Sequence, residues 1–153
     1  MESTENVQNM VQKAFYDPIT ELLLKKSNLT HAQFETLMID ILVDTMSDEK
    51  TPFKQKAYFR GKKVSRGSFS RTLSQGRTRV ISSVFTILLL NYVGILQGSP
   101  FEEYQILAEK LREYLIAVES AGQVQSKALL KRVEEDLEAG IAELSKPTSL
   151  KKM

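Results

Sequence analysis

The sequence contains no cysteine and no tryptophan, and its 153 residues include a single histidine, His31. Without cysteine the chain has no disulfide framework, no thiolate nucleophile and no cysteine zinc site. One histidine, with no second ligand residue at a metal-like spacing, leaves neither a histidine metal site nor a Ser-His-Asp triad. Gly-rich phosphate loops and the H-E-x-x-H and G-x-S-x-G motifs are also missing. These absences predict a non-enzymatic protein that uses no metal and no cofactor.

The sequence also lacks the features of an export signal and of a membrane span. Residues 1–5 are polar and acidic rather than basic and apolar. The uncharged run at 80–96 is shorter than the ~20 residues that a bilayer requires, and four polar residues interrupt it: Ser82, Ser83, Thr86 and Asn91. We therefore expect a cytoplasmic protein without integral membrane insertion, in which this run belongs to a central helix that the other helices surround.

Acidic residues are absent from the middle of the chain. Residues 1–49 carry a net charge of −6 and residues 81–153 a net charge of −2, whereas residues 50–80 carry +10 and no acid. The ten basic residues of this basic segment are Lys50, Lys54, Lys56, Arg60, Lys62, Lys63, Arg66, Arg71, Arg77 and Arg79. Such a block within acidic surroundings indicates a surface that meets phosphate or anionic lipid.

Helix start signals recur along the chain, and no alternating strand pattern is present. The signals combine a capping side chain, a proline at the first helical position or a capping box; they lie at Asp17–Pro18, Thr30 with Gln33, Thr51–Pro52, Ser65, and Ser99–Pro100 with Glu102. The helix after Thr30 is predicted to bury Phe34, Leu37, Met38, Ile41, Leu42 and Met46. The long helix after Ser65 has a predicted core stripe of Phe69, Leu73, Gly76, Val80, Val84 and Ile87. The fold class is all-α, a helical bundle.

The last third of the chain has the spacing of coiled-coil seams. Apolar residues alternate at three and four positions in two segments separated by Ala121 and Gly122; they are Tyr104, Leu107, Leu111, Tyr114 and Val118, then Leu130, Val133, Leu137, Ile141 and Leu144. This pattern predicts a C-terminal antiparallel helical hairpin. We expect a helical domain at residues 1–98 and the hairpin at 99–153, where the seams either dimerise the protein or pack within one chain.

The segment at residues 57–73 reads AYFRGKKVSRGSFSRTL. A small residue precedes a glycine, followed by an apolar residue, a serine cap and two further apolar residues, namely Ala57, Gly61, Val64, Ser65, Phe69 and Leu73. This succession resembles the helix-turn-helix of transcription regulators, in its repressor and sigma-factor region-4 versions, and that of small archaeal helix-turn-helix proteins. The resemblance implies a helix-turn-helix at about residues 51–80. Lys62 and Lys63 are additional between the glycine and the apolar residue, so the first helix is expected to be shorter or differently tilted.

If Phe69 and Leu73 face the core, polar side chains of the same helix project outward. Arginine can read guanine, glutamine can read adenine, and lysines near the turn can contact phosphates. The predicted nucleic-acid-binding residues are Lys54, Lys56, Arg60, Lys62, Lys63, Arg66, Ser68, Ser70, Arg71, Ser74, Gln75 and Arg77.

These observations predict a DNA-binding protein, either a transcription regulator or a nucleoid-associated protein, that acts as a homodimer with two recognition helices in successive major grooves. An alternative is an interaction or scaffold protein whose basic segment docks to an acidic protein, to RNA or to an anionic membrane. The sequence specifies neither the DNA target nor whether binding activates or represses.

Overall fold

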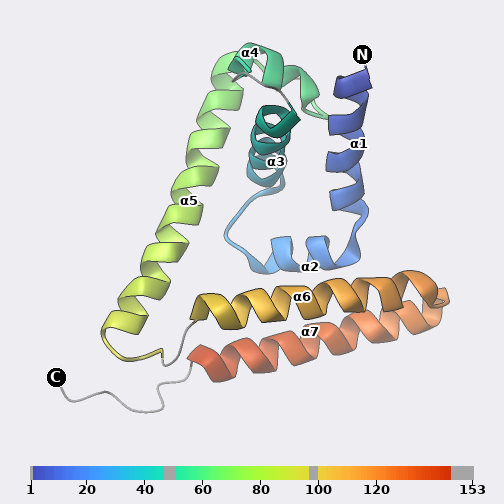
Figure 1. The fold of residues 1–153 in the computed structure, drawn as a ribbon, viewed down its shortest axis with the longest axis vertical. Helices are drawn as coiled ribbons and strands as arrows, with labels where there is room; N and C mark the ends of the chain where they lie inside the picture. The colour runs from blue at the N-terminus through green and yellow to red at the C-terminus, as the bar shows by residue number, and fades with distance from the viewer. Residues whose placement is uncertain (1, 47–50, 97–99, 146–153) are drawn as a thin grey trace. The chain divides into compact units, whose positions relative to one another are not determined.

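A computed structural model describes residues 2–46, 51–96 and 100–145 (Figure 1). These residues form seven α-helices and one 3₁₀-helix and no strand, which confirms the all-α class: α1 (Glu2–Tyr16), α2 (Pro18–Lys26), α3 (His31–Met46), α4 (Phe53–Lys56), η1 (Ala57–Phe59), α5 (Arg66–Tyr92), α6 (Pro100–Ser120) and α7 (Gln123–Ser145). The chain divides into two compact units, residues 1–82 and 83–153. We predicted a domain boundary after residue 98, whereas the boundary between these units falls after residue 82, within the sequence of α5.

Local capping explains where α2 and α3 begin. Asp17 caps α2 by accepting the Ile19 N–H at 2.9 Å, and Pro18 occupies the first helical position. Before α3 the backbone N–H of Thr30 donates to Gln33 Oε1 at 3.1 Å, and the Gln33 N–H donates back to Thr30 Oγ1 at 3.2 Å. This reciprocal pair is the predicted capping box.

The start predicted at Thr51 is wrong in its capping residue. Pro52 stands at the cap of α4 without a side-chain cap hydrogen bond, and the Thr51 N–H donates to Asp44 Oδ1 at 3.3 Å instead. The start predicted at Ser99 lies outside the described residues.

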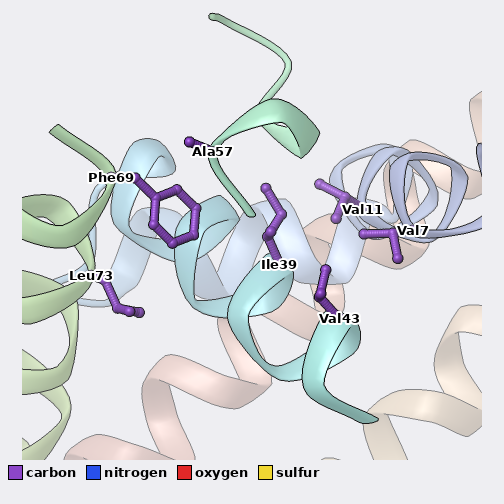
Figure 2. Packing of buried hydrophobic residues seen from close by; sticks show 7 residues of the cluster. All are labelled: Val7, Val11, Ile39, Val43, Ala57, Phe69 and Leu73. Atoms are coloured by element: carbon purple, nitrogen blue, oxygen red, sulfur yellow. The ribbon is translucent and has the colours of Figure 1, made fainter. Parts of the chain in front are cut away.

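The core of the first unit is built by α1, α3, η1 and the beginning of α5 (Figure 2). Its buried apolar cluster consists of Val7, Val11, Ile39, Val43, Ala57, Phe69 and Leu73. Fully burying a side chain of the size of Phe69 or Leu73 contributes roughly 1.5–3 kcal/mol. The first turns of α5 are therefore fixed to the unit by their apolar side.

The buried face of α3 differs from the predicted one. Ile41 and Met46 were expected in the core but are exposed, Ile41 by 63%. The side chains buried on α3 are instead Gln33, Thr36, Ile39, Asp40 and Val43, while Leu37, Met38 and Leu42 pack partly buried against the cluster. Gln33 and Thr36 have hydrogen-bond partners next to or within α3, whereas the buried carboxylate of Asp40 needs cations from other elements.

The expectation that α5 is surrounded by other helices is also wrong. Its buried residues are Phe69, Leu73 and Gly76, whereas Val80 and Val84 of the predicted stripe are exposed. At Gly76 an added Cβ would lie 3.1 Å from Leu37 Cδ1. The absence of a side chain there allows α5 to pack closely against α3.

In the second unit α6 and α7 form the predicted antiparallel hairpin (Figure 1). The seam residues Leu111, Val118, Val133 and Leu137 are buried, and the Ser126 hydroxyl donates to the Val118 carbonyl at 2.9 Å across the turn. These four residues pack within one chain. Among the helices described, none is both long and apolar enough to span a membrane.

Candidate nucleic-acid interface

The cations of the basic segment separate into two groups in the structure. One group is engaged by acids or carbonyls of the first unit, and the other is exposed at the surface. Lys50 lies outside the described residues. The division was not visible in the sequence, because the engaging groups lie on elements that precede the basic segment.

Lys56 belongs to the engaged group. Its side chain is 2% exposed, and Nζ lies 2.7 Å from both Asp40 Oδ1 and Asp44 Oδ1. Asp40 and Asp44 are one helical turn apart on α3, so both carboxylates reach the same ammonium. The pair holds α4 against α3. Lys56 was predicted to contact nucleic acid, and its burial corrects that prediction.

Arg60 is the second engaged cation. Its Nε lies 2.7 Å from Glu35 Oε2, and Nη1 donates to Thr36 Oγ1 at 2.6 Å and to the Ala32 carbonyl at 3.2 Å. The other carboxylate oxygen of Glu35 accepts the Gly61 N–H at 2.7 Å. The start of the loop before α5 is thus clamped to α3. The guanidinium of Arg60 is directed inward and 8% of its side chain is exposed. This burial corrects the prediction that Arg60 contacts nucleic acid.

Two further arginines on α5 contact the body of the unit. Arg77 Nη2 lies 2.5 Å from Asp40 Oδ2, although its side chain remains 55% exposed. The Arg79 guanidinium donates to the Asn28 carbonyl. Asp40 therefore joins α3, α4 and α5 through two cations. Arg77 lies at the edge of the predicted interface, with one nitrogen committed to this contact.

The remaining cations form what we call the basic surface: Lys54, Lys62, Lys63, Arg66 and Arg71. All five are exposed, and within the described parts of the chain none of them forms an ion pair. A solvated face normally mixes charges of both signs. Among the described residues, the α3 acids Glu35, Asp40 and Asp44 are instead engaged by Lys56, Arg60 and Arg77. The field of the basic surface is consequently positive.

The start of α5 adds to this positive field. Ser65 caps the helix by accepting the Ser68 N–H at 3.1 Å, and the first turn contains no acid. A helix N-terminus favours anions through its free N–H groups and its dipole. Outward from this turn lie the exposed polar predictions Ser68, Ser74 and Gln75, with Ser70 half-buried. Ser68 and Ser70 lie between Arg66 and Arg71, and Ser74 and Gln75 follow Arg71 on the same helix.

The element before the turn is short. It consists of the four residues of α4 and the single 3₁₀ turn of η1, which ends at Phe59. Ala57, the small residue of the motif, is buried, and Val64 packs against the core cluster. The extra lysines at 62 and 63 lie in the loop between η1 and α5. The anchoring acids of α3 are the residues that sequence reasoning missed, because the sequence does not show that Asp40 is buried; its spacing of one helical turn from Asp44 is the signal that the sequence does contain.

Comparison of the chain with family models, with curated proteins and with solved structures finds no match.

Proposed function

We propose that this chain is a non-enzymatic, cytoplasmic DNA-binding protein, a transcription regulator or a nucleoid-associated protein, that contacts duplex DNA through the basic surface. The single observation that carries the proposal is the division of the cations. Three acids of α3 are matched by inward-directed cations, and five exposed cations are left without an acid partner among the described residues. An unmatched positive surface of this kind binds phosphates by releasing counterions.

Each part of the surface has a distinct role in this account. Lys54, Lys62 and Lys63 lie on α4 and on the loop, where phosphate contacts set the position of the protein on the duplex. Arg66, Arg71 and Gln75 lie on α5, which enters the major groove as a recognition helix. Arginine there pairs with guanine and glutamine with adenine. A homodimer would present two such helices to successive grooves.

The test is a fluorescence-anisotropy titration of duplex DNA with the full chain at about 50 mM salt, where phosphate contacts contribute most. A double variant, Arg66→Ala with Arg71→Ala, removes two charges from the basic surface. We expect its affinity to fall by roughly 10²-fold or more, since each contact to a phosphate or base contributes on the order of 1–3 kcal/mol.

The matched control is Lys110→Ala with Arg112→Ala, which removes the same charge from exposed positions of α6. It should lower affinity less than about threefold, through net charge alone. Equal losses in the two variants would mean that only net charge matters. No binding by the wild type would assign the basic surface to an acidic protein, to RNA or to an anionic membrane, which the same titration distinguishes with labelled RNA and with anionic vesicles.

A further inference from the structure

The second half of α5 carries an exposed apolar face that the basic surface does not explain. Its members, which we call the apolar face, are Val84, Phe85, Leu88, Leu89 and Tyr92, and between 43% and 82% of each side chain is exposed. All five lie in the second compact unit. Positions 84, 88 and 92 form one row at successive helical turns, and positions 85 and 89 form the neighbouring row. The two rows make a continuous surface on one side of the helix.

Exposure of this size is unfavourable for an isolated chain. The apolar face exposes roughly 600 Å² if a large side chain presents about 200 Å², which reaches the size at which patches on soluble proteins are usually interaction sites. The hairpin of the same unit shows the contrast, because α6 and α7 bury Leu111 and Val133 against each other. The apolar face has no equivalent cover among the described residues.

We propose that the apolar face binds the same face of a second copy of this chain. A stable protein interface buries ~800 Å² on each partner, and the area of the apolar face approaches that value. In a two-fold symmetric dimer the same surface of both chains forms the interface, so a charged residue near the axis would face a residue of the same charge. The sequence has no charged residue from Val80 to Phe101. The apolar face therefore pairs with itself without like-charge repulsion, whereas the charged outer sides of α6 and α7 do not.

The arrangement of the rows also suits a helix pair. Side chains at i and i+4 form ridges, and the ridges of one helix fit the grooves of another at a crossing angle of about −50°. Rows 84-88-92 and 85-89 supply two ridges and the groove between them. Such a dimer does not use the buried seam residues of the hairpin, Leu111, Val118, Val133 and Leu137, which are already packed within the chain. It also does not depend on DNA binding, although it would supply the two copies that the proposed function needs.

The test is the molar mass of the full chain in solution without DNA, measured by light scattering and by sedimentation equilibrium. The wild type is expected at twice its chain mass of 17.4 kDa. Leu88→Glu places a charge against its copy at the centre of the apolar face and should raise the dimer dissociation constant by at least about 100-fold. The control Ile116→Glu changes an apolar residue of α6 that is even more exposed than Leu88 and should leave the mass at the dimer value.

A second variant keeps the test independent of any effect of the glutamate on folding. Because the chain has no cysteine, Leu88→Cys and Ile116→Cys each give one site for a nitroxide label. We expect a short inter-chain spin–spin distance for the label at position 88 and a longer or unresolved one at position 116. A monomeric wild type, or a dimer that Leu88→Glu leaves intact, would overturn the proposal. So would a monomer that sediments with uncharged phosphatidylcholine vesicles, since the apolar face would then bind lipid.

Discussion

At the scale of single residues, the basic segment contains buried and exposed cations that the sequence does not distinguish. Lys54 and Lys56 lie two positions apart on α4, yet one is exposed and the other is 2% exposed between two carboxylates. Burying a charge is costly unless a partner and hydrogen bonds accompany it. The buried lysine therefore stabilises the arrangement of α4 on α3, while the exposed lysine is available to a ligand.

This contrast predicts opposite effects for one substitution at the two positions. Lys56→Met removes the ammonium from the buried Asp40 and should lower the free energy of unfolding by roughly 3 kcal/mol, near the lower end for a broken buried pair because Arg77 still contacts that carboxylate. Lys54→Met should leave stability unchanged within measurement error. Urea denaturation followed by circular dichroism measures both.

In DNA binding, we expect the larger effect from Lys54→Met and the smaller one from Lys56→Met. Lys54→Met should reduce the salt dependence of binding by about one phosphate contact, and Lys56→Met, at temperatures where it is folded, should leave that dependence unchanged. An equal stability loss in both variants would contradict the assignment of Lys56 as the buried anchor.

At the scale of the element, α5 combines three different surfaces along 27 residues. Its first turns are buried on the side of Phe69 and Leu73 and basic on the opposite side. Gly76 ends the buried part, and the apolar residues from Val80 to the end of the helix are exposed, apart from the half-buried Ile87 and Leu90. One helix thus carries both the proposed DNA-binding surface and the proposed self-association surface, and its first turns are anchored to the first unit.

Gly76 controls how closely that anchored part approaches α3. Gly76→Leu must displace Leu37, whose Cδ1 would lie 3.1 Å from the new Cβ, and overpacking of this kind costs about 1–3 kcal/mol. We expect a lower thermal unfolding midpoint for this variant. Gly67→Leu is the matched control on the same helix, because the nearest atom to its added Cβ is Ser65 Oγ at 4.0 Å. It should not lower the midpoint, and a loss equal to that of Gly76→Leu would contradict the close approach.

At the scale of the whole molecule, local signals predicted the elements well and long-range contacts poorly. The capping box at Thr30 and Gln33 and the cap at Ser65 are confirmed, because a cap involves residues within one turn. The partners of Lys56 and Arg60 were missed, since Asp40 and Glu35 lie 16 and more positions earlier on another helix. No stretch of local sequence shows which cation an acid on a different element will engage.

The burial of α3 and the exposure of α5 were misjudged for a related physical reason. Hydrophobic periodicity describes which faces of a helix are apolar, and it does not say how many neighbours cover them. On α3 the neighbouring cations made Asp40 a buried residue, while on α5 no helix among the described residues covers Phe85 or Leu88. The concentration of cations could be predicted because the charge of a segment can be counted without knowing its neighbours. That count does not show which cations face inward, so Lys56 and Arg60 were wrongly included among the exposed ones.

The central claim is that the exposed cations of the basic surface, and not the buried ones, bind DNA, with Lys54, Lys62 and Lys63 at the phosphates. The most direct measurement is the dependence of the duplex-DNA association constant on salt concentration. For each bound chain the logarithmic slope should lie near roughly −3, which corresponds to about three neutralised phosphates, and Lys62→Ala with Lys63→Ala should make it shallower by about two. A slope no steeper than about −1, or one that this double variant leaves unchanged, would contradict the account.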